Sequence, residues 1–230
     1  VNGVDVPHFL AGKFTNLADG IDIEFFSAEK AQPIPTPRTK PILLLPARIV
    51  REKGHLDLVN AVGHLRKRGI QCQIAFAGRP DSNRFLSELK GAIEHLGLQA
   101  DVHFLGMLEI HSLRNWYAAS ALVVLPTYHH EGLPRTILEA QSMRTPPIAY
   151  NMGGVSDGIH DGQTGFIIRP GDTATLSERI STLLLDPALR ARFGTSGREF
   201  VERKFSLAAL ASRHEQFYTK VVARSQLSRK

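Results

Sequence analysis

Cysteine and long apolar runs are both scarce in this sequence. Its 230 residues include a single cysteine, Cys72, so an internal disulfide bond is excluded. No stretch approaches the roughly eighteen apolar residues that a membrane-spanning helix requires, and the first residues lack the basic-then-apolar pattern of a secretory signal. These absences fit a reducing compartment, and we expect a cytoplasmic location.

No block of like charge is present either, although basic residues outnumber acidic ones. Lysine and arginine total 28 against 22 aspartate and glutamate residues, and the net charge of +6 favours an anionic partner. The cations lie in small scattered groups, such as Arg66 to Arg68, and no RNA-binding motif with interleaved aromatic residues occurs. We therefore expect no nucleic acid partner. The anionic partners that remain are a membrane surface, contacted peripherally, and a phosphorylated small molecule.

Several cofactor and metal motifs are missing. The loop at 46–54 has one glycine, Gly54, which excludes the glycine-rich turn of dinucleotide dehydrogenases, and no Walker-type phosphate loop is present. No Asp-x-Asp triplet occurs. His129, His130 and Glu131 are consecutive, so on extended backbone neighbouring side chains point apart. We expect neither a metal site nor a cofactor.

What the sequence does contain, from residue 42 onward, is a regular alternation of apolar runs and amphipathic stretches. Strands are predicted over 42–45, 72–77, 102–105, 121–125, 147–150 and 164–168. Helices are predicted over 56–65, 82–95, 110–119, 136–143, 173–185, 188–203 and 207–223. Strands joined by helical crossovers pair in parallel, so we predict an α/β fold with a doubly wound, Rossmann-like parallel sheet. Ligands of such sheets bind outside the carboxyl ends of the strands.

The predicted organisation has three parts. Residues 1–40 contain several prolines and read as an interdomain connector, with turn-and-strand segments at 2–9 and 19–26. Residues 41–205 form the α/β domain, and residues 206–230 form a C-terminal helix. The chain does not begin with methionine, and we expect it to be part of a longer protein.

The loop after the first predicted strand is the first candidate binding element. Arg48 and Lys53 lie five residues apart and lead into a helix that begins near Gly54. A helix N-terminus attracts phosphate, an arginine can make a forked contact to phosphate oxygens, and a lysine supplies a point charge. The pair suits a diphosphate, although both residues could also be ordinary surface cations.

The second candidate element runs from Glu131 to Glu139, between the fourth predicted strand and the next helix. With a helix start at Thr136 or a neighbour, the backbone N–H groups of 132–136 would face a ligand. Glu139, about one turn into the helix, can return to the same pocket, where a carboxylate can accept two sugar hydroxyls. Taken alone, Glu139 could instead complement the helix dipole.

These elements, with further motifs in the same order, resemble the C-terminal, donor-binding domain of family 4 retaining glycosyltransferases, which have the GT-B fold. The family signature is two glutamates separated by seven residues, matched by Glu131 and Glu139. The other family-like pieces are Arg48 with Glu52-Lys53-Gly54, Phe104-Leu105-Gly106, Tyr117 to Ala121, Gly153-Gly154-Val155, Gly162 to Phe166 and Pro170-Gly171-Asp172. The resemblance extends from about residue 42 to 206.

The resemblance implies specific roles for these positions. Arg48 and Lys53 would hold the donor diphosphate, and Glu131 would contact the transferred hexose; these three would be the catalytic residues. Glu139 would bind the ribose. The remaining donor-binding positions would be Leu105 and Gly106 beside the base, the amides of Gly132 and Leu133, and Thr136 at the helix start.

Two positions depart from the family pattern. Pro134 stands where many members have glycine, and because proline has no N–H, one backbone donor to the sugar would be missing. Ser156-Asp157 replaces a common Pro-Glu pair. The sugar preference is therefore open.

The activity implied is transfer of a hexose, with retention, from a nucleotide-diphosphate sugar to a glycan or lipid-linked acceptor. A missing N-terminal domain would bring the acceptor, so we expect this half to be inactive alone, and the site could work at the inner membrane face. The alternatives are a nucleotide-sugar-binding module without transfer activity and a related GT-B enzyme such as an epimerase.

Overall fold

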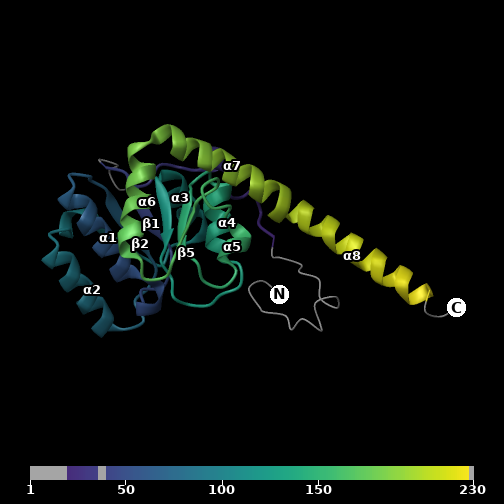
Figure 1. The fold of residues 1–230 in the computed structure, drawn as a ribbon, viewed down its shortest axis with the longest axis horizontal. Coiled ribbons are helices and arrows are strands. Elements are labelled where there is room, and N and C mark those ends of the chain that lie inside the picture. The colour runs from purple at the N-terminus through teal and green to yellow at the C-terminus, as the bar shows by residue number, and fades with distance from the viewer. Residues whose placement is uncertain (1–19, 36–39, 228–230) are drawn as a thin grey trace.

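Six parallel strands form the centre of the molecule (Figure 1). The computed structural model describes residues 20–35 and 40–227. The strands are β1 (Ile42–Leu45), β2 (Gln73–Ala77), β3 (Val102–Gly106), β4 (Leu122–Leu125), β5 (Pro147–Tyr150) and β6 (Phe166–Ile168). Their order in the sheet is β3-β2-β1-β4-β5-β6. After β3 the chain returns to the other side of β1 to form β4, so the switch point of this doubly wound sheet lies between β1 and β4.

Helices cover both faces of this sheet. The helices are α1 (His55–Lys67), α2 (Asn83–His95), α3 (Ile110–Ala119), α4 (Arg135–Ser142), α5 (Val155–Gly158), α6 (Thr173–Leu185), α7 (Pro187–Phe205) and α8 (Leu207–Leu227). Short 3-10 turns lie at Ala28–Lys30, Arg51–Lys53 and Gln99–Asp101. Helices α1, α2 and α6 pack on one face, while α3, α4 and α7 pack mainly on the other. The predicted α/β fold is confirmed.

The two cores arise from the alternation of side chains along each strand. In β1, Leu43 and Leu45 enter the core beneath α1 and α6, whereas Ile42 and Leu44 enter the core beneath α3 and α4. All four are at most 1% exposed, which explains why the strand is a continuous apolar run.

Most element boundaries agree with the sequence prediction within two residues, and the differences have local causes. Strand β6 begins at Phe166 because Thr164 is used in a turn, where its Oγ1 accepts from the His160 N–H at 2.9 Å. Helix α4 begins at Arg135, one residue before the predicted Thr136, and ends at Ser142. The short helix α5 was not predicted, since four residues show no periodicity.

The segment before β1 packs on the domain. Ile21 and Phe26 are 1% and 2% exposed and belong to the core beneath α3, α4 and α7. Ile21 forms a parallel bridge with Ser206, and Arg198 donates to the carbonyls of Ile23 and Phe26 at 2.9 and 2.8 Å. The other predicted turn-and-strand segment, at 2–9, lies outside the described residues.

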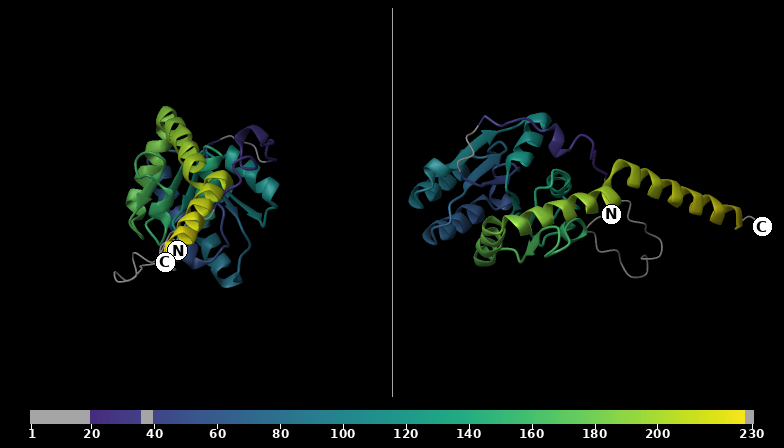
Figure 2. Two further views of the ribbon diagram at one scale, coloured as in Figure 1. Left: turned by 90° about the vertical axis from the view of Figure 1, so that its right-hand side faces the viewer. Right: turned by 90° about the horizontal axis from the view of Figure 1, so that it is seen from above.

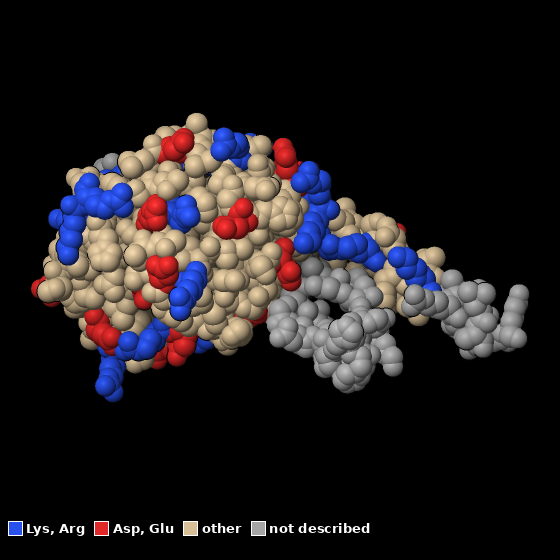
Figure 3. All heavy atoms as spheres, in the orientation of Figure 1, with Lys and Arg blue, Asp and Glu red and all other residues tan. Residues whose placement is uncertain are grey.

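Helix α8 extends beyond the domain, as Figure 1 and the right view of Figure 2 show. Among the described residues, no helix combines the length and the apolar character needed to cross a bilayer. Lysine and arginine side chains are interspersed with acidic ones over the body of the visible face (Figure 3), in keeping with the scattered charge of the sequence.

Candidate functional site

A cavity of about 340 Å³ opens at the carboxyl ends of β1 and β4, at the switch point of the sheet. Its lining comes from the end of β1 and the β1–α1 loop, the end of β4 and the β4–α4 loop, and the first residues of α4 and α5. The lining residues are Leu45, Pro46, Ala47, Arg48, Lys53, Leu125, Thr127, His129, Glu131, Pro134, Thr136 and Val155. Four of the predicted donor-binding residues, from the two candidate elements of the sequence, thus meet in one cavity.

Glycines let the β1–α1 loop approach its neighbours closely. Gly54 has φ +70°, and a Cβ there would lie 1.9 Å from the Pro126 carbonyl oxygen. A Cβ on Gly78 would lie 2.0 Å from the carbonyl oxygen of Ala47. The Tyr128 N–H donates to the Glu52 carbonyl at 2.7 Å, so the loops on either side of the cavity are tied together.

Opposite charges meet inside the cavity. Lys53 forms an ion pair with Glu131, and their side chains are 16% and 35% exposed. Arg48 pairs with Asp81 at the outer edge, where it is 65% exposed. The cavity therefore combines a cation held within it, a second cation at its mouth and one carboxylate.

The backbone that carries Glu131 rests on a pair of glycines. The Gly154 N–H donates to the Glu131 carbonyl at 3.0 Å. Gly153 has φ +54°, and a Cβ there would lie 1.9 Å from the same carbonyl oxygen; a Cβ on Gly154 would lie 2.7 Å from the Leu133 nitrogen. The Gly153-Gly154 motif thus has a steric reason: no side chain fits between the two loops.

Glu139 lies one turn beyond Thr136 in α4 but outside the residues that line the cavity. Its Oε2 accepts from the Tyr117 hydroxyl at 2.8 Å, and the side chain is 14% exposed. Burial raises the pKa of this carboxyl, and the hydrogen bond from Tyr117 and the charge of Arg135 act in the opposite direction. Burial also raises the pKa of Tyr117, so the phenol remains a donor.

The other predicted residues are not among those that line the cavity. Leu105 and Gly106 are partly buried at the end of β3. Gly132 and Leu133 are in the loop supported by Gly153, and the Leu133 side chain is buried in the core. The structure thus groups Arg48, Lys53, Glu131 and Thr136 around one cavity and does not place the others in its lining.

Sequence reasoning missed a hydrogen-bonded cluster beside the cavity. The hydroxyls of Tyr128 and Tyr150 both donate to Asp57 Oδ2, at 2.6 and 2.7 Å. Burial and the nearby carboxylate raise the pKa of Tyr128 to about 12 and raise that of Tyr150 further. These residues come from three segments far apart in the sequence, so no local pattern indicates them.

A buried histidine, His55, begins α1 directly after the loop that contains Lys53. His55 is 0% exposed and packs on Phe76, with ring centroids 4.9 Å apart. Burial lowers its pKa to about 4; the Val50 backbone acts against this shift, and the charge of Lys53 adds to it. His55 is therefore neutral at physiological pH. No cluster of three metal-ligating side chains occurs in the described part of the chain.

The sheet is all-parallel and has a mixed-charge cavity at its switch point, next to a helix N-terminus. In α/β domains ligands bind at such switch points, and helix N-termini attract phosphate groups. The chain matches the family model described as "Glycosyl transferases group 1" over residues 26–200. The chain belongs to this family, which confirms the resemblance found in the sequence.

Similar proteins agree with this assignment. Alpha-D-kanosaminyltransferase of Streptomyces kanamyceticus is 32% identical over 182 residues, which are 79% of this chain and 46% of that protein. The capsular polysaccharide biosynthesis glycosyltransferase CapM of Staphylococcus aureus is 28% identical, with 78% of this chain and 46% of that protein covered. The chain thus spans about half the length of these relatives.

Among solved structures, a glycosyltransferase from Rickettsia africae ESF-5 has a TM-score of 0.80 and 25% identity. The match covers 94% of this chain and 60% of that one. The open parallel sheet flanked by helices is accordingly the Rossmann-like half of a GT-B glycosyltransferase fold.

Proposed function

We propose that this chain is the donor-binding half of a retaining glycosyltransferase that transfers a hexose from a nucleotide-diphosphate sugar to a glycan or lipid-linked acceptor. The observation that carries the proposal is the meeting of Arg48, Lys53, Glu131 and Thr136 around one cavity at the switch point. The names of a kanosaminyltransferase and of a capsular polysaccharide glycosyltransferase among the relatives support sugar transfer.

The chemistry assigned to the cations follows from charge development. As the glycosidic bond to phosphate breaks, the nucleoside diphosphate gains negative charge, and fixed cations stabilise it without a metal or cofactor. Lys53, only 16% exposed, is held where solvent screens its charge less than that of Arg48. We therefore assign Lys53 the larger contribution and Arg48 an outer contact to the diphosphate.

The carboxylates are assigned to the sugars. Glu131 faces the cavity beside Lys53, where it can contact the hexose while the oxocarbenium-like transition state forms. Glu139 would accept the ribose hydroxyls, held in place by the Tyr117 hydroxyl. The amides of Gly132 and Leu133 would face the sugar or phosphate, and Leu105 and Gly106 at the end of β3 would border the base.

The acceptor is assigned to a second domain. The chain covers less than half of the two relatives named above, so we propose that transfer requires the remaining part of the protein and that this half binds donor without transferring it. A lipid-linked acceptor would bring the assembled protein to the cytoplasmic face of a membrane.

Thermal stabilisation of the chain by uridine, guanosine and adenosine diphosphates and their sugar conjugates tests donor binding. At a hundred times its dissociation constant, the correct nucleotide should add about 2.7 kcal/mol, or roughly 5–10 °C for a chain of this size. Lys53→Met should abolish the shift, whereas Lys67→Met, an exposed lysine at the far end of α1, should leave it unchanged. No shift with any nucleotide would refute donor binding.

Transfer is tested separately in the complete protein. Formation of an α-linked product from an α-linked nucleotide sugar would establish retention. Tight nucleotide-sugar binding without transfer to any acceptor would instead identify a binding module, and inversion of a sugar stereocentre would identify an epimerase.

A further inference from the structure

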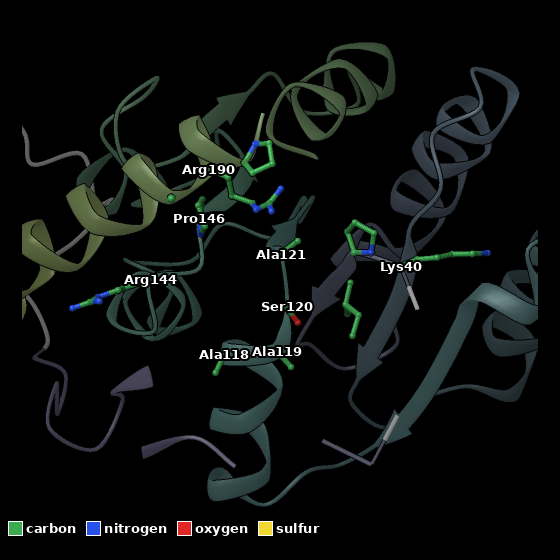
Figure 4. A pocket seen from close by; sticks show the side chains of 12 residues that line it. Lys40, Ala118, Ala119, Ser120, Ala121, Arg144, Pro146 and Arg190 are labelled. Carbon is green, nitrogen blue, oxygen red and sulfur yellow. The ribbon is translucent and has the colours of Figure 1, made fainter. Parts of the chain in front are cut away.

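A second cleft, of about 590 Å³, lies at the opposite end of the strands, where β1, β4 and β5 begin (Figure 4). It opens between the C-terminal end of α3 and the first turn of α7. Lys40, Pro41 and Ile42 border it on the β1 side, and Pro146, Pro187 and Arg190 border it on the other. Its size is in the range of small-molecule sites.

The charged residues that line this cleft are all basic. They are Lys40, Arg144 and Arg190, and no acidic side chain is among the lining residues of the described chain. Lys40 and Arg144 point outward (Figure 4) and pair with Asp101 at 2.5 Å and with Glu29 at 3.7 Å.

Arg190 differs from these two cations. It is half-buried, and in Figure 4 its guanidinium points into the cleft, toward Ala121. Its Nη1 donates to the carbonyls of Leu183 and Leu184, at 2.8 and 3.4 Å, and it forms no ion pair within the described residues. Nη1 is fixed by carbonyls at the C-terminal end of α6, so the guanidinium is held in place without a carboxylate partner among the described residues.

The rest of the lining indicates the body of the ligand. Besides Ser120, the uncharged side chains are apolar and mostly small; they include Pro41, Pro146, Pro187 and the alanines 118, 119 and 121. Such walls suit an apolar or ring-shaped group better than an extended polyhydroxyl chain.

We propose that this cleft binds a phosphate monoester, with the phosphate on Arg190 and the organic group against the prolines and alanines. A guanidinium makes forked hydrogen bonds to phosphate oxygens. The site is distinct from the donor cavity because the two lie at opposite ends of β1 and β4. The ester could be a soluble small molecule or the head group of a lipid such as phosphatidic acid.

Backbone amide shifts in ¹⁵N-resolved NMR spectra locate the binding of phenyl phosphate and of inorganic phosphate. Phenyl phosphate should shift the amides of Ser120, Ala121 and Arg190, bind more tightly than inorganic phosphate, and do so equally in Lys53→Met, where the donor cavity is disabled. Co-sedimentation with phosphatidylcholine vesicles, with and without phosphatidic acid, separates the lipid source from the soluble one.

Two variant pairs test the assignment. Arg190→Gln should weaken phenyl phosphate binding at least tenfold, whereas Arg192→Gln, an exposed arginine outside the lining, should not. If loss of the Nη1 contacts unfolds Arg190→Gln, Ala119→Glu places a carboxylate in the cleft without removing them, and Ala119→Gln is its uncharged match. Only the glutamate variant should lose binding. Shifts confined to Lys53 and its neighbours, or equal losses in both members of a pair, would overturn the proposal, as would an absence of binding to both the ester and the vesicles.

Discussion

Lys53 and Glu131 are proposed to contact two parts of one ligand, yet in the structure they form an ion pair with each other. A diphosphate at Lys53 would meet the negative charge of Glu131 as well as the lysine. Removing that charge should therefore favour a nucleoside diphosphate that has no sugar, while it removes the group proposed to contact the hexose.

Glu131→Gln should tighten the binding of the free nucleoside diphosphate by about three- to tenfold, since a partly exposed charge pair contributes on the order of 1 kcal/mol. In the complete protein, transfer should fall by about a hundredfold, as expected for loss of a group that acts on the transition state. Calorimetric titration and initial-rate measurements give the two quantities. Glu52→Gln, an exposed acid on the opposite loop, is the control; if it tightened binding equally, general electrostatics would explain the effect.

His55 makes stability depend on pH. Its pKa is about 4 in the folded chain against 6.5 when unperturbed, so between these values the unfolded chain binds a proton that the folded chain does not. The contribution is fully present above pH 6.5 and is lost as pH falls toward 4, by about 3 kcal/mol in total. Urea unfolding at several pH values should show this slope in the native chain and a smaller one in His55→Gln. Equal slopes would mean that His55 does not titrate in this way.

At the scale of the element, the position of Glu131 depends on the loop that contains Gly153. Gly153 and Gly162 both have positive φ, +54° and +71°, but a Cβ meets the Glu131 backbone at the first and nothing within 4 Å at the second. Alanine substitution at the two positions therefore distinguishes the cost of backbone strain from the cost of a steric clash.

Gly162→Ala should cost about 1–2 kcal/mol of unfolding free energy from strain alone. Gly153→Ala should cost a further 1–3 kcal/mol from overpacking, and it should also weaken donor binding because the Glu131 loop must move. Denaturant unfolding and nucleotide titration of both variants test this. If Gly153→Ala bound the nucleotide as tightly as Gly162→Ala, the position of the Glu131 loop would not determine donor binding.

The helices and strands could be predicted because their signals are local. The continuous apolar run of β1 and the three-residue spacing of Leu56, Val59 and Val62 reflect burial on one or two faces. Arg48, Lys53 and Glu131 could be placed in one site because the carboxyl ends of parallel strands share an edge. Two other features could not be predicted: the hydrogen bond from Tyr117 to Glu139 and the convergence of Tyr128 and Tyr150 on Asp57. They depend on how a helix packs against helices, loops and strands distant in the sequence.

At the scale of the whole molecule, the domain's core includes residues that precede the sheet. The sequence indicates a proline-rich connector up to residue 40, but Ile21 and Phe26 fill the core formed with α3, α4 and α7. Phe26 packs edge-on against Tyr117, with ring centroids 6.2 Å apart, and Tyr117 in turn holds Glu139. Through these contacts, the N-terminal segment supports a residue proposed to bind ribose.

Phe26→Ala should lower the free energy of unfolding by about 3–5 kcal/mol, the usual cost of emptying a buried phenylalanine site. It should also weaken nucleotide binding, because Tyr117 would lose the ring that it packs against and Glu139 would be held less firmly. Denaturant unfolding and nucleotide titration measure the two effects. Glu24→Ala, at an exposed position of the same segment, should change stability by no more than about 0.5 kcal/mol. If Phe26→Ala were as stable as Glu24→Ala, the packing of this segment would contribute nothing to the stability of the domain.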